Sequence, residues 1–219
     1  MTPKTTRPTR ARPRNPSHRA TRPAARAKKQ NEPSALVVGL TGPNASGKGE
    51  VAKFLATHGF SVCSLSDVVR EEATRRGLDH SRDNLIRIGV DLRASGGTGA
   101  LARHILPQLH GHAVVDSIRN PGEVDVLRTL PRFVLLGVDA PQPLRFERSA
   151  RRGRLGDGAT LEEFARKEAL ENSETEAGQQ LVKTLALADA VVFNDGTIDT
   201  LHVKVRNALR LRRFRLGGT

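Results

Sequence analysis

The chain has 219 residues and a formal net charge of +13 at pH 7, with a single cysteine, Cys63. This length accommodates one domain with a full hydrophobic core plus an appendage. One cysteine excludes an intramolecular disulfide, and no stretch approaches the roughly 18 consecutive apolar residues that cross a bilayer. We therefore expect a cytoplasmic protein that has no membrane partner.

Residues 1–34 contain no Leu, Ile, Val or Phe and carry ten Lys or Arg residues against the single acid Glu32, a net charge of +9. That leaves +4 of the formal charge for residues 35–219. A segment of this composition cannot bury enough apolar surface to fold, so we predict a disordered basic tail over 1–34 and a folded domain over 35–219. The tail suits nonspecific, salt-sensitive contact with nucleic acid phosphates, and the alternatives are a solubilising extension or a wrongly assigned start codon.

The domain opens with a predicted strand over residues 35–40, a glycine-rich turn and a helix. The turn reads Gly42-Pro43-Asn44-Ala45-Ser46-Gly47-Lys48-Gly49, and the next residue is Glu50. Such a turn points backbone N–H groups and the positive end of a helix at an anion. Lys48 adds a charge that reaches the β- and γ-phosphates of a triphosphate. The sequence therefore predicts a P-loop over Gly42–Glu50 that binds ATP, although Gly49 replaces the Ser or Thr that usually holds Mg²⁺.

Short β-like runs alternate with helical patterns through the rest of the domain, and this predicts an α/β fold. Further strands are expected at 60–65, 113–116, 133–138 and 190–193. Helices are expected at 50–58, 67–76, 84–93, 100–109, 123–130, 141–152, 161–172, 179–187 and 200–212. We predict the three-layer fold of P-loop NTPases, a five-stranded parallel sheet flanked by helices. The helical insertion over 66–111 is longer than a plain crossover needs, which suggests that it holds a second substrate.

Charged residues follow the second and third predicted strands, at the edge of a parallel sheet where ligands bind. Ser66 or Asp67 is expected to cap a helix in which Arg70 lies one turn further along. The third strand ends in Asp116, a residue placed to meet the hydration shell of Mg²⁺, and Arg119 follows it. Arg93, before a glycine-rich turn, is a weaker third arginine. Arginine offers paired donors to phosphate oxygens, so we expect these arginines to bind a phosphate.

An arginine-rich helix follows the fourth strand. Its arginines are Arg145, Arg148, Arg151 and Arg152, with Arg154 just beyond, and Gly156-Asp157-Gly158 comes next. Arg148 and Arg152 are four residues apart and share one helix face. The glycines permit a hinge. The segment resembles the lid of nucleoside monophosphate kinases, which implies that its arginines close over the phosphoryl group in transfer.

These motifs resemble those of adenylate kinase and related nucleoside monophosphate kinases over residues 35–210. The resemblance rests on Gly47-Lys48-Gly49, on Asp67–Arg70, on Asp116–Arg119 and, loosely, on the lid. It implies that Arg70 and Arg119 grip the phosphate of an acceptor, with Lys48, Arg148 and Arg152 as catalytic residues. The implied activity is transfer of the γ-phosphoryl group of ATP, with Mg²⁺, to a nucleoside or deoxynucleoside monophosphate.

Two alternatives stay open. The stretch Ala188–Gly196 is similar to the end of dephospho-coenzyme A kinases, whose acceptor is a hydroxyl, and Asp67 would then act as a general base. A non-enzymatic nucleotide sensor, or an ATPase that reaches a partner through the basic tail, is favoured by Gly49 and Glu50. Both residues weaken an ordinary Mg²⁺ site.

Overall fold

A computed structural model describes residues 35–153, 158–170 and 172–211, and the fold is given for these. The predicted tail, residues 1–34, and most of the predicted lid hinge, at 154–157, lie outside the described residues. Within the described ranges, no helix is both long enough and apolar enough to cross a membrane.

The domain is built on a five-stranded sheet in the order β2-β3-β1-β4-β5. The strands are β1 (Val37–Thr41), β2 (Ser61–Ser64), β3 (Ala113–Ile118), β4 (Phe133–Asp139) and β5 (Ala190–Phe193). Every pairing between neighbouring strands is parallel. The structure confirms the predicted five-stranded parallel sheet.

The central strand, β1, is buried along its whole length. Val38 pairs with Val114 of β3 on one side and with Val134 of β4 on the other. Side chains alternate between the two faces of a strand, so Val37 and Val38 belong to different core clusters. A strand that is buried on both faces has a continuous run of apolar residues, and this run is the sequence signal that predicts β1.

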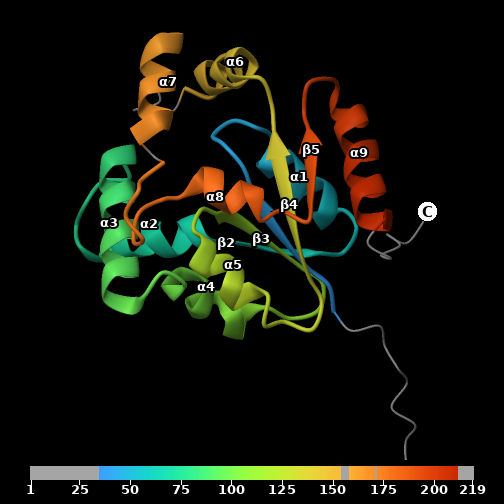
Figure 1. The fold of residues 1–219 in the computed structure, drawn as a ribbon, viewed down its shortest axis with the longest axis horizontal. Helices are drawn as coiled ribbons and strands as arrows, with labels where there is room; N and C mark the ends of the chain where they lie inside the picture. The colour runs from blue at the N-terminus through green and yellow to red at the C-terminus, as the bar shows by residue number, and fades with distance from the viewer. Residues whose placement is uncertain (1–34, 154–157, 171, 212–219) are drawn as a thin grey trace, which may run out of the picture. The chain divides into compact units, whose positions relative to one another are not determined.

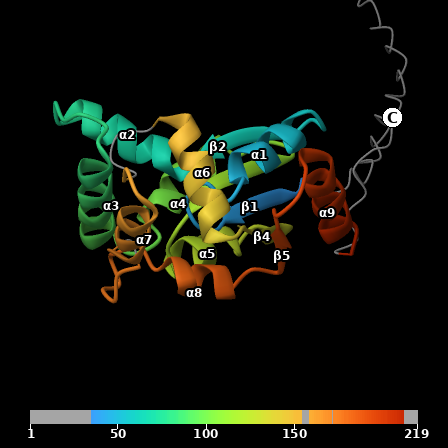
Figure 2. The same ribbon diagram turned by 90° about the horizontal axis from the view of Figure 1, so that it is seen from above.

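Helices cover both faces of the sheet (Figures 1 and 2). One core cluster packs beneath α1 (Lys48–Ala56) and α9 (Ile198–Leu211). The other face carries α2 (Leu65–Arg75), α3 (Arg82–Gly96), α4 (Ala100–Ile105) with a 3₁₀ turn at Leu106–Gln108, α5 (Pro121–Leu127) and α8 (Leu181–Ala186). The helices α6 (Gln142–Arg152) and α7 (Leu161–Leu170) lie beyond the carboxyl ends of the strands (Figure 1).

Most helices start one or two residues away from the position expected from the sequence, and the starts of α2 and α5 show how the local structure sets the boundary. The chain passes from β2 into α2 without a connecting residue, so α2 begins at Leu65 and Ser64 is its N-cap, without a side-chain capping bond. The prediction that Ser66 or Asp67 caps this helix was wrong. Helix α5 begins at Pro121, earlier than expected, because Asn120 and Glu123 form a capping box around its first turn.

Candidate nucleotide and acceptor site

The P-loop has the backbone shape that a polyphosphate requires. Gly42 and Gly47 have φ values of 135° and 112°, and Ala45 lies in the left-handed region with φ 59°. A left-handed residue at this point turns successive N–H groups to one side, which forms an anion-binding nest at the start of α1. A Cβ atom on Gly42 would lie 2.0 Å from the Val138 carbonyl oxygen, so the loop cannot carry a side chain there.

Lys48 folds across the mouth of the loop. Its Nζ donates to the carbonyl oxygens of Gly42 and Pro43, at 2.7 and 2.8 Å. The ammonium is therefore held over the nest where a β- or γ-phosphate would sit. The glycine that follows, Gly49, faces open space, since a Cβ atom there would meet nothing within 4 Å.

Glu50 also lines the cavity in front of the loop. Its carboxylate lies 3.6 Å from Nε2 of His202 and 4.0 Å from Nζ of Lys53. Its predicted place in the nucleotide-binding segment stays a prediction. Both of these contacts are to helix side chains, α9 and α1, and neither is to the loop.

The helix α6 lies against the P-loop through its arginines. Arg145 is buried and bonds to Glu168 of α7 with both terminal nitrogens, while its Nη1 also donates to the Asn44 carbonyl oxygen at 3.4 Å. Arg152 donates from Nη2 to Oδ1 of Asn44 at 3.3 Å. Arg148 reaches the other side of the loop, where its Nη2 donates to the Asn194 carbonyl oxygen at 3.1 Å.

Arg148 and Arg152 both line the cavity, as the lid hypothesis requires. Burial lowers the pKa of the Arg148 guanidinium from its ordinary value, and the nearby charge of Arg151 acts in the same direction. The guanidinium remains protonated at neutral pH, because arginine starts from a very high pKa. A partly desolvated cation next to a P-loop interacts strongly with a phosphoryl group in transfer.

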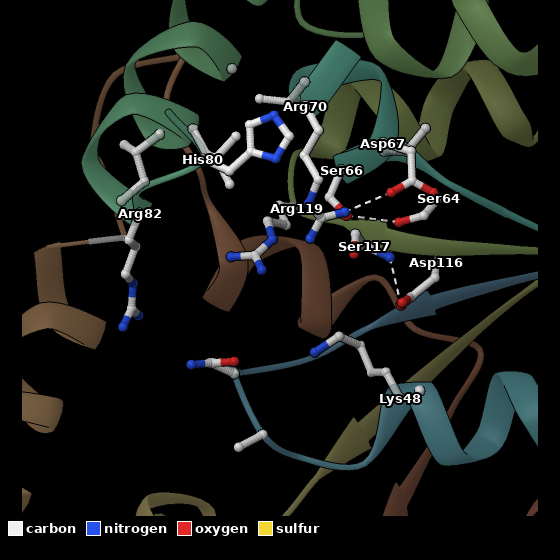
Figure 3. A pocket seen from close by; sticks show the side chains of 18 of the residues that line it. Lys48, Ser64, Ser66, Asp67, Arg70, His80, Arg82, Asp116, Ser117 and Arg119 are labelled. Carbon is white, nitrogen blue, oxygen red and sulfur yellow. Dashed lines mark hydrogen bonds and ion pairs between the residues drawn. The ribbon is translucent and has the colours of Figure 1, made fainter. Parts of the chain in front are cut away.

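On the opposite wall, α2 carries the predicted Asp67 and Arg70 (Figure 3). Arg70 Nη1 donates to Oδ1 of Asp67 at 2.6 Å and to Oγ of Ser66 at 3.0 Å. Ser66 in turn shares a hydrogen bond of 2.9 Å with Ser64. Asp67 is thus neither a cap nor isolated, and it orients Arg70 from the first turn of α2.

The end of β3, which runs two residues further than expected, and Arg119 just after it lie between the P-loop and Arg70 (Figure 3). Asp116 accepts a hydrogen bond of 2.6 Å from the Ser117 N–H, and Ser117 has a φ of 66°, in the left-handed region. Arg119 donates from Nη1 to Oε1 of Gln179 at 2.8 Å. Figure 3 shows the side chains of Lys48, Asp116, Arg119 and Arg70 around one common space.

Arg93 has a different environment from the other arginines. Its guanidinium is 4% exposed and is paired with the fully buried Glu123, with Nε and Nη2 at 2.9 and 2.8 Å from Oε1. The other oxygen of Glu123 accepts from the N–H groups of Arg119 and Asn120. Arg93 lies at the wall of the cavity, but its donors on this side are taken by Glu123. The pairing with Glu123 uses Nε and Nη2, and the role of Arg93 as a phosphate ligand stays a prediction.

One cavity of about 1260 Å³ joins all of these groups. It brings together the P-loop from Asn44 to Glu50, the predicted Asp67, Arg70, Asp116 and Arg119, and the two lid arginines. Gly42 and Pro43 lie behind Lys48 as the acceptors of its hydrogen bonds. The cavity is large enough for a nucleotide and a second small substrate, which is the space that a phosphoryl transfer needs.

Sequence reasoning missed several residues at this site. His80 and Ser81, which come just before α3, and Arg82, its first residue, line the cavity opposite the P-loop. Gln179, which precedes α8, reaches Arg119 over 60 positions of sequence. Asn194 bonds to the P-loop itself. Only Asn194 carried a sequence signal, because it lies in the stretch Ala188–Gly196 that is similar to the end of dephospho-coenzyme A kinases.

The carboxylates that the described residues place at the cavity would hold Mg²⁺ together with substrate phosphates and water. Among the described residues no group of three or more His, Cys, Asp or Glu side chains converges as a metal site. Asp116 is the carboxylate that faces the P-loop, next to Lys48 (Figure 3). Mg²⁺ in kinases is commonly held by one or two carboxylates, substrate phosphates and water, so this arrangement fits the ion.

Comparison with known proteins supports the reading of the fold. Residues 41–165 match the AAA domain family described as AAA_17, which covers more than half of the chain. A UPF0200 protein of Pyrococcus horikoshii is 32% identical over 183 residues, covering 80% of this chain and 96% of that protein. The chain belongs to the UPF0200 family.

Solved structures extend the likeness beyond this family. A Thermus thermophilus protein has a TM-score of 0.55 at 22% identity, with 81% of this chain and 98% of that chain covered. Shikimate kinase from Aquifex aeolicus has a TM-score of 0.51 at 14% identity, with 84% and 100% covered. At these identities the likeness concerns the fold. This UPF0200 chain has the α/β fold of P-loop kinases, as the sequence predicted.

Proposed function

We propose that the protein is an ATP-dependent phosphotransferase that moves the γ-phosphoryl group to a nucleoside or deoxynucleoside monophosphate. The observation that carries the proposal is the arrangement of charges in one cavity. The P-loop and Lys48 form one wall, Arg70 and Arg119 lie on another, and Arg148 and Arg152 come from α6. A donor polyphosphate and an anionic acceptor would meet between these walls.

The roles follow from the chemistry of phosphoryl transfer, which asks the protein mainly for positioning and charge stabilisation. Lys48 and the P-loop backbone hold the donor phosphates. Arg70 and Arg119 bind the acceptor phosphate in paired geometry. Arg148 and Arg152 neutralise the equatorial oxygens of the group in transfer, a contribution that reaches about 10³-fold in rate. Asp116 would hold Mg²⁺, which supplies charge neutralisation on the phosphates.

An acceptor panel tests this proposal. The protein is incubated with Mg²⁺-ATP and each ribo- and deoxynucleoside monophosphate, and ADP formation is measured together with acceptor phosphorylation. We expect transfer to at least one monophosphate, at rates that Lys48→Met lowers by about 10²-fold or more. Nucleotide binding without transfer to any acceptor would contradict the proposal and favour a nucleotide sensor.

Arg70 and Arg119 form the wall that would bind the acceptor, here called the acceptor wall. Substitutions at these two residues separate acceptor binding from donor binding. Arg70→Met and Arg119→Met should raise KM for the acceptor by about tenfold or more, because each removes charge-assisted hydrogen bonds, while KM for ATP changes little. Arg210→Met, at an exposed position of α9, is the matched control. Equal effects of all three substitutions would argue against an acceptor-binding role.

Asp67 supports a second candidate, a dephospho-coenzyme A kinase whose acceptor is a hydroxyl. Its side chain is 61% exposed and lines the cavity, where a carboxylate could take a proton. Adding dephospho-coenzyme A to the panel tests this. If it is the acceptor, Asp67→Asn should lower kcat by about 10²-fold or more, whereas a monophosphate kinase should lose much less.

A further inference from the structure

Asn194 connects the end of the sheet to the P-loop. It follows β5 directly, is 7% exposed, and its backbone N–H donates to the Asp139 carbonyl oxygen of β4 at 2.7 Å. Its side-chain Nδ2 donates to the Ser46 carbonyl oxygen at 2.8 Å, across 148 positions of sequence. A buried amide fixed by its own backbone to β4 is a rigid support for the loop.

This hydrogen bond controls the direction of a loop N–H group. The peptide unit is planar and trans, so the Ser46 carbonyl and the Gly47 N–H point in opposite directions. When Asn194 fixes the carbonyl on its own side, the Gly47 N–H points away from Asn194. That N–H belongs to the set of donors that a nest presents to an anion.

The fit at this contact is close. A Cβ atom on Gly47 would lie 2.2 Å from Nδ2 of Asn194, and Gly47 has a φ of 112°. Glycine is therefore required at position 47 both by the backbone conformation and by the Asn194 amide. The Asn194 amide therefore packs directly against the loop backbone at Gly47.

Asn194 also contacts the lid helix. Its carbonyl oxygen accepts from Nη2 of Arg148 at 3.1 Å. The second terminal nitrogen of Arg148 is buried and has no hydrogen-bond partner among the described residues. One residue thus contacts both the phosphate loop and a lid arginine.

We propose that Asn194 is a positioning residue for nucleotide binding: it orients the Ser46–Gly47 peptide so that the Gly47 N–H faces the phosphates of the donor. This deepens the proposed function, because it rests on a polyphosphate being the ligand of the loop. Asn194 acts through the loop backbone, and it touches neither the base nor the reacting atoms in this role.

The experiment compares the binding of two ligands, ATP and inorganic tripolyphosphate, by calorimetry. Asn194→Asp replaces the N–H donor with an oxygen that repels the Ser46 carbonyl, and Asn194→Ser removes the amide. Both variants should weaken binding of ATP and of tripolyphosphate by the same factor, on the order of tenfold, as expected for a lost buried hydrogen bond. Equal factors identify an effect on phosphate binding.

Other outcomes overturn the proposal. A loss for ATP with unchanged tripolyphosphate affinity would place Asn194 at the base, and unchanged affinity for both would make it structural only. Asn207→Asp, the same substitution at an exposed position of α9, is the control and should leave both affinities unaltered. If both Asn194 variants unfold, the unaltered chain provides the test. Its Gly47 amide resonance should change in chemical shift when tripolyphosphate is added, and an unchanged chemical shift overturns the proposal.

These binding measurements need no acceptor, so they separate this inference from the proposed function. Equal losses for both ligands, in a protein that phosphorylates no acceptor, would support the role of Asn194 and contradict the kinase proposal. Failure of the unaltered chain to bind either ligand would contradict both.

Discussion

Gly49 stands where many P-loops carry a hydroxyl, and the structure explains how the chain can lack one. The position faces open space in front of α1, so nothing near it depends on the absent side chain. The carboxylate of Asp116 lies near the Lys48 side chain (Figure 3). A metal ion held by phosphates, water and a single carboxylate would be bound weakly by the protein itself.

A hydroxyl at position 49 should therefore increase the affinity of the ATP-bound site for Mg²⁺. We expect Gly49→Ser to lower the Mg²⁺ concentration for half-maximal ATP binding by about three- to tenfold, since it adds one oxygen ligand or a hydrogen bond to the ion's water shell. Titration of ATP affinity with MgCl₂ measures the effect. Gly49→Ala fills the same space without an oxygen and should not show it; an equal effect of Ala would contradict this explanation.

At the scale of elements, the buried pair of Arg93 and Glu123 joins the insertion helix α3 to α5. Breaking one partner of a buried ion pair leaves an uncompensated charge, which typically costs about 3–5 kcal/mol. We expect Arg93→Met to lower the free energy of unfolding by about this amount in urea denaturation.

The double variant Arg93→Met, Glu123→Leu distinguishes charge from packing. It removes the unpaired carboxylate, and stability should recover in part. Recovery should be incomplete, because Glu123 also accepts from the N–H groups of Arg119 and Asn120. If the double variant is no more stable than Arg93→Met, the stranded charge is not the cause of the loss.

A second link joins α2 to α3 at the surface. Glu72 accepts from Arg75 and Arg76, and Arg76 also bonds to Asp91 of α3 at 2.7 Å. Hydrogen bonds from Arg75, then from Arg76, lower the pKa of Glu72 from 4.5 to about 2. A carboxylate with a depressed folded-state pKa stabilises the fold above its unfolded pKa, and this contribution is lost as pH falls through the folded value.

Glu72→Gln should therefore be less stable than the parent at pH 7, and the difference should shrink between pH 4.5 and about 2. Urea unfolding midpoints of both proteins across this range provide the measurement. Glu71→Gln, at an exposed position of the same helix, is the control. A difference that stays constant down to pH 2 would show that Glu72 acts through packing and not through its charge.

The elements themselves followed closely from the sequence, and the reasons are local. Buried parallel strands read as apolar runs, and the turn of residues 42–49 has a backbone requirement that glycine placement reveals. Contacts between distant segments were not readable in this way. Gln179 and Asn194 lie at the site because the order of the strands in the sheet brings distant segments together. The pairing of Arg93 with Glu123 depends on how α3 packs against α5.

At the scale of the whole chain, residues 1–34 carry a net charge of +9 beside a domain with +4. We propose that this tail binds nucleic acid through phosphates. Full-length protein should bind a single-stranded oligonucleotide in fluorescence anisotropy at low salt, with an affinity that falls steeply as KCl increases. Deleting residues 1–34 should abolish this binding and leave ATP affinity unaltered. Binding that survives the deletion would assign it to the domain.

The position of β1 has a dynamic consequence. It is hydrogen-bonded to a strand on each side and buried throughout, whereas β2 and β5 have one neighbour each. Backbone amides in such a strand open only with the whole domain, so β1 should be among the last segments to exchange its protons for deuterium. The insertion helices around the acceptor wall lie outside this paired centre and should exchange sooner. The phosphate loop would then keep its shape while the opposite wall adjusts to whatever molecule it receives.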